Sequence, residues 1–426
     1  MSLPTPLSAA SRRTDRSPIS ELMQRALAAP DLISLAAGFV DHATLPVEPT
    51  ARAAAAMLAD DIDGRRSLQY GTTRGDLKLR QQLIAHIEAD EKVAPGTFAD
   101  AQHRLVVTTG SQQLLELVCE ALLDPGDIVL VESPTYFVFL PLVKTRGAQS
   151  IGIETDAGGM RLDSLEEALA EIASRGQLDK VKLVYTITEH SNPSGLCLAA
   201  DRRAGLVALV NKWSKHQQIF ILEDSAYRGL TYDGIEPPSV WRHDPEARCV
   251  ILARTFSKTY SPGLKVGYGV LPEALIGPVL DLKGNHDFGS AHFNQQLLAE
   301  VMASGDYRAQ IALMRSTYKR KRDVMLNALE EHLAPVEPDA TWTRAEGGIY
   351  VWLTLPEGID TGPDGPLFPR CVKHGVIYVP GAYAFAGSNP PTNHARLTFG
   401  VTSESGIVEG IRRLSVALAE CLVAVD

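Results

Sequence analysis

The chain has 426 residues, of which 51 are acidic and 41 are basic, and its formal net charge is −10. This length fits two domains, or one large domain that carries a smaller one, and the acidic balance gives no reason to expect a partner with a phosphate backbone. The five cysteines are isolated, and neither a Cys-x-x-Cys pair nor a His-Glu-x-x-His motif occurs, so we expect no metal site.

The N-terminal 50 residues are predicted to form an arm with one short helix over residues 19–28. Residues 1–20 are polar, include three arginines and lack the apolar core of a signal peptide. No stretch of the chain reaches the length of a transmembrane span. We therefore expect a cytoplasmic protein that keeps its cysteines reduced.

The middle of the chain alternates short apolar runs with amphipathic helical patterns. Continuous apolar runs of this length are typical of strands that are buried on both faces of a parallel sheet. Helices are expected over residues 164–174, where Ser164 and Glu167 would form a capping box, and over residues 201–215. The alternation predicts an α/β domain with a mainly parallel central sheet. The predicted strands are residues 105–108, 128–131, 183–187, 219–222 and 250–253.

The C-terminal part has a different pattern. A long charged helix follows residue 300, and then come a strand over residues 347–352, a turn at Pro380-Gly381 and a closing helix over residues 405–422. We interpret this part as a smaller α+β domain that the N-terminal arm completes. The predicted divisions are residues 1–50 for the arm, 51–300 for the large domain and 301–426 for the small domain.

A basic run, Lys319-Arg320-Lys321-Arg322, lies within the long charged helix. It could be read as a nucleic-acid patch, but apolar residues recur around it at helical spacing. We therefore expect a solvated helix face.

Polar residues follow the predicted strands, at the edge where open α/β sheets bind their ligands. Thr109-Gly110-Ser111-Gln112 would open a helix over residues 113–122, and such a turn is either a phosphate site or a plain helix cap. Asn192, Asp224 and Lys258 follow three later strands at intervals of 32 and 34 residues. Each interval fits one strand–helix–strand unit, so the three side chains are predicted to meet at one edge of the sheet.

These segments resemble the fold-type-I aminotransferases of class I and II, which depend on pyridoxal 5′-phosphate (PLP). The sequence is most similar to the 2-aminoadipate and aromatic aminotransferase subgroup, which also supplies the aminotransferase-like half of MocR regulators. The likeness extends from residues 33–38 to residues 396–399 and so covers nearly the whole chain. It is carried by Thr109-Gly110-Ser111-Gln112, Asn192-Pro193-Ser194-Gly195, Asp224-Ser225-Ala226-Tyr227 and Ser257-Lys258-Thr259-Tyr260-Ser261-Pro262-Gly263-Leu264.

The resemblance implies the PLP-dependent transferase-like fold and PLP as the cofactor. Lys258 would hold PLP as a Schiff base and would then move the proton between the substrate and the cofactor. Asp224 would pair with the pyridine nitrogen and keep it protonated, whereas the neighbouring Glu223 would point to the other face of the strand. Asn192 and Tyr227 would hydrogen-bond the phenolic oxygen of the cofactor.

The remaining cofactor-binding residues follow from the same resemblance. Tyr136 would stack on the ring, although a core aromatic is the alternative. Tyr70 resembles a residue that reaches the phosphate across a dimer interface, which implies a homodimer with shared active sites. Lys265 stands where the family usually has arginine, so it would supply charge without a bidentate fork. The other residues assigned to the phosphate are Gly110, Ser111, Gln112 and Ser257.

Substrate binding is assigned to Arg396 and Gly38. Arg396 would clamp the α-carboxylate through two parallel hydrogen bonds, and Gly38 would lie close to the substrate. Ala37 and Val40 depart from the glycine and proline that the family usually has there. Arg25 is left between a contact with a distal carboxylate and an exposed structural role.

The predicted function is transfer of an amino group between an L-amino acid, which is aromatic, aliphatic or aminoadipate-like, and a 2-oxo acid such as 2-oxoglutarate. A PLP-dependent lyase, decarboxylase or cyclopropane-forming synthase is the alternative, because a fold does not fix a reaction. The two kinds of reaction would be distinguished by the final state of the cofactor, because amino transfer converts it to its amine form. A cofactor-sensing regulator is disfavoured by the acidic charge and by motifs that begin close to Met1. We expect no nucleic-acid or membrane partner.

Overall fold

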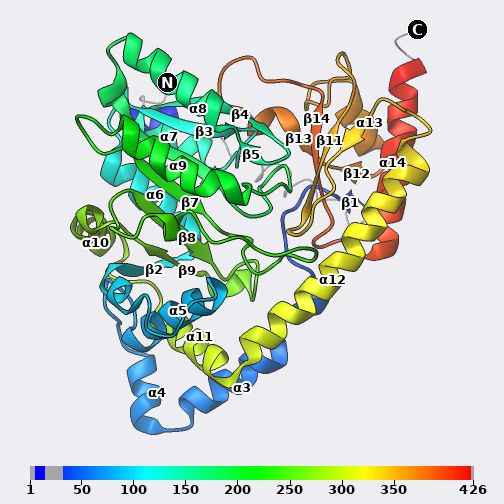
Figure 1. Ribbon diagram of the computed structural model, residues 1–426. Coiled ribbons are helices and arrows are strands. Elements are labelled where there is room, and N and C mark those ends of the chain that lie inside the picture. Colours follow the sequence, from blue (N-terminus) through cyan, green and yellow to red (C-terminus); the bar gives the residue numbers. More distant parts are fainter. Residues whose placement is uncertain (1–4, 15–31, 424–426) are drawn as a thin grey trace.

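The computed structural model describes residues 5–14 and 32–423 (Figure 1). The helix predicted over residues 19–28 and its Arg25 lie outside this part of the chain. A large sheet with helices on both faces occupies one side of the molecule, and smaller sheets with their own helices occupy the other (Figure 1). None of the helices in the described ranges is both long enough and apolar enough to span a membrane.

The large sheet has eight strands in the order β2-β9-β8-β7-β6-β3-β4-β5. The central pairs β8–β7, β7–β6, β6–β3 and β3–β4 are parallel, whereas β9 runs antiparallel to both of its neighbours. The prediction of an α/β fold with a mainly parallel central sheet is therefore confirmed. The strands are β2 (Leu105–Thr109), β3 (Ile128–Ser133), β4 (Gln149–Asp156), β5 (Gly159–Met160), β6 (Val181–Ile187), β7 (Phe220–Asp224), β8 (Val250–Thr255) and β9 (Val266–Val270).

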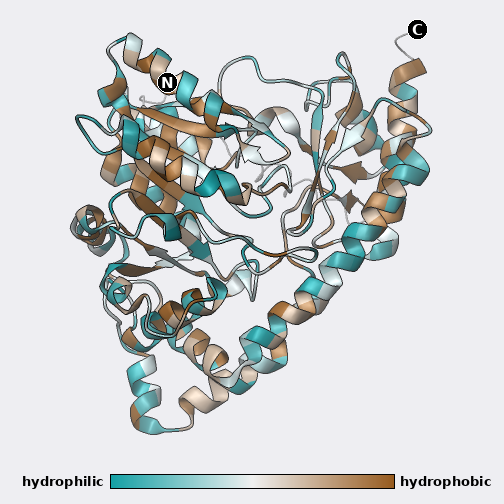
Figure 2. Cartoon of the chain, viewed as in Figure 1, coloured by the Kyte–Doolittle hydropathy of each residue, from teal (hydrophilic) through white to brown (hydrophobic). Residues whose placement is uncertain are grey.

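Helices cover both faces of this sheet, and residues of β2, β3, β6, β7 and β8 pack into two separate cores, one on each face. Leu222 of β7 faces one core, against α6, and Ile221 faces the other. Figure 2 shows hydrophobic residues along the strands and the inner sides of the helices. The helices are α1 (Ala9–Arg13), α3 (Val47–Leu58), α4 (Asp61–Ser67), α5 (Leu77–Asp90), α6 (Gly110–Leu122), α7 (Leu140–Arg146), α8 (Leu162–Ser174), α9 (Ala200–Trp213), α10 (Glu273–Asp287) and α11 (His292–Ser304).

The capping box predicted for α8 is wrong. The helix begins at Leu162, two residues earlier than expected, and Arg161 is its N-cap without a side-chain cap bond. Leu162 packs against the core, which favours the longer helix. Ser164 lies inside the first turn, where its N–H donates to Asp163 Oδ1 at 3.0 Å.

The second part is built on an antiparallel sheet with the order β10-β11-β14-β13 and a two-stranded parallel sheet, β1–β12. The pairing of β1 with β12 attaches the N-terminal segment to this part. Helix α12 runs from α11 to α14 along one side of the molecule (Figure 1). The elements are β1 (Ile33–Ser34), β10 (Thr341–Trp342), β11 (Tyr350–Thr354), β12 (Val376–Ile377), β13 (Val379–Pro380), β14 (His394–Thr398), α12 (Asp306–Ala328), α13 (Leu367–Lys373) and α14 (Glu404–Val423).

The basic run in α12 is only partly solvated, contrary to the expectation of an open helix face. Lys321 is buried and its Nζ lies 2.7 Å from Asp41 and 3.0 Å from the carbonyl oxygen of Gly400. Arg322 is buried and lies 2.7 Å from Asp233. Two of the four cations are therefore used to hold other segments against the helix.

Candidate active site

A cavity of about 480 Å³ lies between the ends of the large-sheet strands and the antiparallel sheet. Of the residues predicted for the site, all except Tyr70 line this cavity. They come from the ends of strands, from the start of α6, from the N-terminal segment and from β14. These residues are Gly38, Gly110, Ser111, Gln112, Tyr136, Asn192, Asp224, Tyr227, Ser257, Lys258, Lys265 and Arg396.

Lys258 follows β8 and reaches across the cavity to the N-terminal segment. Its Nζ donates a hydrogen bond of 2.6 Å to the carbonyl oxygen of Gly38. Burial lowers the pKa of Lys258, and the positive charges of Arg396 and Lys265 act in the same direction, although Tyr350 opposes them. A lowered pKa increases the fraction of neutral amine, which is the nucleophilic form of a lysine.

Asp224 is the last residue of β7 and is buried. Tyr185 donates to its Oδ2 at 2.9 Å, and the N–H of Ala226 donates to its Oδ1 at 3.2 Å. Burial raises the pKa of Asp224 to about 6 in spite of these two donors. The carboxylate faces the cavity, and a cation placed there would reverse the cost of its burial.

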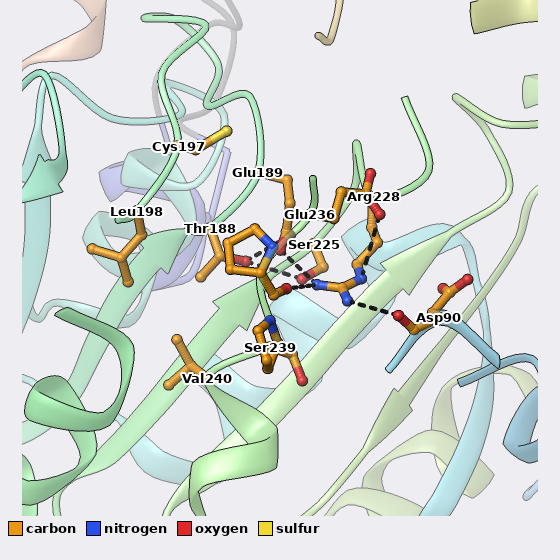
Figure 3. Close-up of polar contacts among 12 residues, drawn as sticks. Asp90, Thr188, Glu189, Cys197, Leu198, Ser225, Arg228, Glu236, Ser239 and Val240 are labelled. Atoms are coloured by element: carbon orange, nitrogen blue, oxygen red, sulfur yellow. Dashed lines mark hydrogen bonds and ion pairs between the residues drawn. The ribbon is translucent and has the colours of Figure 1, made fainter. Parts of the chain in front are cut away.

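The opposite face of the same strand ends carries a buried network of charged and hydroxyl groups (Figure 3). As predicted, Glu223 points away from the cavity, where it accepts the N–H groups of Val240 and Trp241 at 2.9 and 2.7 Å. Thr188 donates to Glu189 at 2.7 Å, and Arg228 donates to Glu189 at 3.0 Å. Paired charges and hydrogen bonds therefore hold the ends of β6 and β7 on the face opposite the cavity.

Arg396 is a fully buried residue of β14 on the other side of the cavity. Its Nη1 donates to Asn192 Oδ1 at 2.8 Å, and its Nη2 donates to the carbonyl oxygen of Ala36 at 2.6 Å. Its guanidinium carbon lies 4.4 Å from the ring centre of Tyr350 and 5.2 Å from that of Phe137. Within the described chain Nε is buried without a hydrogen-bond partner, so a carboxylate is a suitable ligand for this edge.

The start of α6 forms the third part of the cavity. Gly110 has a left-handed φ of 70°, and it turns the chain from β2 into the helix. A Cβ on Gly267 of β9 would collide with the backbone of Gly110 and Ser111, so the glycine allows the strand to approach this turn. Thr255 donates to Ser257 Oγ at 3.0 Å beside it. A helix N-terminus with hydroxyl groups and a lysine nearby can hold a phosphate.

Tyr70 does not reach the cavity of its own chain. It is 82% exposed and packs edge to face against Phe288, with 5.7 Å between the ring centres. His190 is buried outside the cavity, with Thr231 Oγ1 and Cys197 Sγ at 2.8 and 3.3 Å from its ring nitrogens. Burial lowers the pKa of His190 to about 4.

Three residues in or beside the cavity were not predicted from the sequence, namely Tyr350, Phe137 and Tyr185. The hydroxyl of Tyr227 donates to that of Tyr350 at 3.0 Å, and a Cβ on Gly38 would collide with the same Tyr350 hydroxyl. The strand that contains Tyr350 was predicted, but no role was given to its side chains. Phe137 follows Tyr136 directly, and its position next to that residue was the available signal.

The sequence profile of the family described as "Aminotransferase class I and II" matches residues 30–414. The chain is 36% identical to aromatic-amino-acid aminotransferase 1 of Thermococcus litoralis over 92% of this chain and 88% of that protein. A structure of Pyrococcus horikoshii kynurenine aminotransferase, in complex with pyridoxamine phosphate (PMP) and kynurenine, superimposes with a TM-score of 0.88 at 34% identity, covering 98% of this chain and 97% of the other. The α-aminoadipate aminotransferase of Thermus thermophilus, complexed with phosphopyridoxyl-leucine, gives a TM-score of 0.83 at 30% identity over 99% and 98%.

Proposed function

The chain belongs to the class I and II aminotransferase family and is a PLP-dependent aminotransferase, and from this premise we propose that it moves the amino group of an aromatic, aliphatic or aminoadipate-like L-amino acid to a 2-oxo acid such as 2-oxoglutarate. The observation that carries the proposal is the meeting of Lys258, Asp224 and Arg396 in one cavity. Among its relatives are an aromatic-amino-acid aminotransferase and an α-aminoadipate aminotransferase, which supports this range of substrates.

The residues of the cavity fit PLP. Asp224 is a buried carboxylate with a raised pKa and a free place for a cation, which the protonated ring nitrogen would fill. Ser111, Ser257 and Lys265 surround the start of α6, where the phosphate would lie. When bound, PLP supplies an acceptor for the electrons of the substrate Cα–H bond.

Two residues would act through their protonation state, Lys258 as a neutral amine and Asp224 as a carboxylate. The Nζ of Lys258 would anchor the cofactor, and as a neutral amine it would accept the proton from the substrate Cα. Asp224 would bind the protonated ring nitrogen as a carboxylate, and the 2.9 Å hydrogen bond from Tyr185 would stabilise its negative charge. Asn192 and Tyr227 would bind the phenolic oxygen, and Tyr136 would cover the ring.

Arg396 would orient the substrate by its α-carboxylate. Because its guanidinium is already held by Asn192 and Ala36, little side-chain freedom remains to be lost when the substrate binds. The aromatic residues of the cavity wall suit an aromatic or aliphatic side chain. They include Phe39, Phe137 and Tyr350.

We also propose a cytoplasmic homodimer with shared active sites. Tyr70 and Phe288 form an adjacent aromatic pair with exposures of 82% and 64%, which suits coverage by a second copy. From there Tyr70 would reach the phosphate site of the partner subunit. Analytical ultracentrifugation should give a dimer, and a monomeric active enzyme would contradict this proposal.

The test is the visible absorbance of the PLP-loaded protein during addition of single amino acids. We expect phenylalanine, leucine or 2-aminoadipate to convert the yellow form to the amine form, and 2-oxoglutarate to restore it. Lys258→Ala is the matched control and should not turn over. Release of ammonia or carbon dioxide without the amine form would contradict the proposed reaction.

A further inference from the structure

A buried lysine lies behind the start of α6 and is not one of the described residues that line the cavity. Lys283 of α10 is fully buried, and its Nζ donates to the two carboxylate oxygens of Asp287 at 2.8 and 2.9 Å. Its third contact is with Ser290 Oγ at 3.0 Å. A buried ammonium needs an acceptor for each of its three protons, and here the third acceptor leads toward the site.

Two chains of hydrogen bonds connect this ion pair to Thr109, the N-cap residue of α6, which lines the cavity. In the first, Ser290 Oγ lies 3.2 Å from Thr109 Oγ1. In the second, Gln113 donates from Nε2 to Asp287 at 2.7 Å, and its Oε1 accepts the N–H of Thr109 at 2.8 Å. Lys283 and Asp287 therefore hold both the side chain and the backbone of Thr109.

The side chain of Thr109 is turned away from the position that an N-cap threonine usually takes. At an N-cap, the threonine oxygen usually accepts a hydrogen bond from an N–H group in the first turn of the helix. Thr109 forms no such bond, and its hydroxyl lies against Ser290 instead. The N–H groups of Gly110, Ser111 and Gln112 have no acceptor within the helix, and a helix binds an anion through such groups. A Thr109 hydroxyl that capped the helix would therefore compete with the phosphate.

We propose that Lys283 is a positioning residue for the cofactor phosphate, because its bond to Ser290 keeps the Thr109 hydroxyl away from the first turn of α6. The N–H groups of that turn then remain free for the phosphate. This proposal rests on the proposed function, which places the phosphate at the start of α6. Lys283 itself would not touch the cofactor. Because Asp287 balances its charge, Lys283 would act through the position of Thr109 and not through added positive charge.

The experiment measures the Kd of PLP for the cofactor-free protein by fluorescence titration. Ser290→Ala breaks the link to Thr109 and keeps the ion pair, whereas Lys283→Met removes the cation. Each change should raise the Kd of PLP about 5-fold, which corresponds to one N-cap hydrogen bond of about 1 kcal/mol. The double variant should bind PLP no more weakly than Lys283→Met, because both changes break the same link. Pyridoxal, which lacks the phosphate, should bind all of these proteins equally.

Ser415→Ala is the matched control, because it removes a buried hydroxyl that donates at 2.9 Å to Ile411 within α14, away from the cavity. It should leave the Kd of PLP unchanged. The proposal is overturned by an unchanged Kd of PLP in Ser290→Ala, by additive losses in the double variant, or by an equal loss of pyridoxal binding. If Lys283→Met does not fold, Ser290→Ala alone decides. A wild type that does not bind PLP would instead contradict the proposed function.

Discussion

The two sides of the cavity are held in place by different means. On the cofactor side, Asp224 ends β7 and Lys258 follows the neighbouring parallel strand β8, and paired charges hold the ends of β6 and β7 on the face opposite the cavity (Figure 3). On the substrate side, Tyr350 and Arg396 lie on the paired strands β11 and β14, and Gly38 comes from the distant N-terminal segment, which a hydrogen bond from Arg396 to Ala36 connects to these strands. The cofactor side is therefore fixed by neighbouring strands of one sheet, whereas the substrate side combines a second sheet with a segment from the distant N-terminal part of the chain.

The largest effect is expected on the substrate side. Arg396→Ala should lower kcat/KM by roughly 10³-fold, because truncation of a buried, hydrogen-bonded cation loses the carboxylate and unpairs its neighbours. The loss should lie mainly in KM, and steady-state kinetics would measure it. Arg396→Lys keeps the positive charge but cannot form two parallel hydrogen bonds, so its kcat/KM should lie between those of wild type and Arg396→Ala. An unchanged KM would show that the carboxylate binds elsewhere.

A smaller loss of a different kind is expected on the cofactor side. Asp224→Asn removes the negative partner of the ring nitrogen and should lower kcat by roughly 10²-fold, while KM stays within a few-fold. Tyr185→Phe, which removes one hydrogen bond to the same carboxylate, should change kcat less and in the same direction. If Asp224→Asn raised KM and left kcat intact, the division between the two sides would be wrong.

The burial of Asp224 also predicts a pH dependence of stability in the cofactor-free protein. The pKa of Asp224 is raised from 3.8 to about 6, so the protonated form is favoured in the folded state. Its contribution to stability is therefore complete below pH 4 and is lost as the pH rises through 6, a change of about 3 kcal/mol. Asparagine has no such titration.

Urea unfolding of wild type and Asp224→Asn between pH 4 and pH 8 measures this contribution. The unfolding free energy of Asp224→Asn minus that of wild type should be larger at pH 8 than at pH 4, because only the wild type loses stability as Asp224 ionises. Glu132, whose pKa burial raises to about 8, is present in both proteins, so only its coupling to the charge of Asp224 enters the difference. A difference that does not depend on pH would contradict the assignment.

The smallest effect concerns the phosphate. Lys265 lies at the open edge of the cavity with a left-handed φ of 52°. Lys265→Arg should bind PLP about 3-fold more tightly, because a guanidinium can hold the phosphate through two hydrogen bonds. Lys265→Gln should bind it more weakly. Fluorescence titration of the cofactor-free protein tests both variants, and equal affinities would remove Lys265 from the site.

The difference between the two sides also explains what the sequence could predict. The five predicted strands occur within a few residues of their expected positions, because buried parallel strands have continuous apolar runs. Three other strands of the large sheet, β4, β5 and β9, were not predicted. In β9, Gly267 and Gly269 interrupt the apolar pattern, and β4 is a partly exposed strand with alternating polar residues.

Within the site, Asn192, Asp224 and Lys258 could be placed together because each follows a strand at a regular interval. Tyr350 could not, because its position depends on how the antiparallel sheet packs against the large one. The burial of Lys321 was missed for a similar reason, since its partner Asp41 lies in a distant segment. Helical periodicity describes only the helix that carries the residue.

The most direct test of the account is to identify the lysine that binds the cofactor. The PLP-loaded protein would be reduced with borohydride, digested and mapped by mass spectrometry. We predict that the phosphopyridoxyl group is on Lys258, the lysine whose Nζ lies 2.6 Å from the carbonyl oxygen of Gly38. A label on any other lysine would contradict the proposed site.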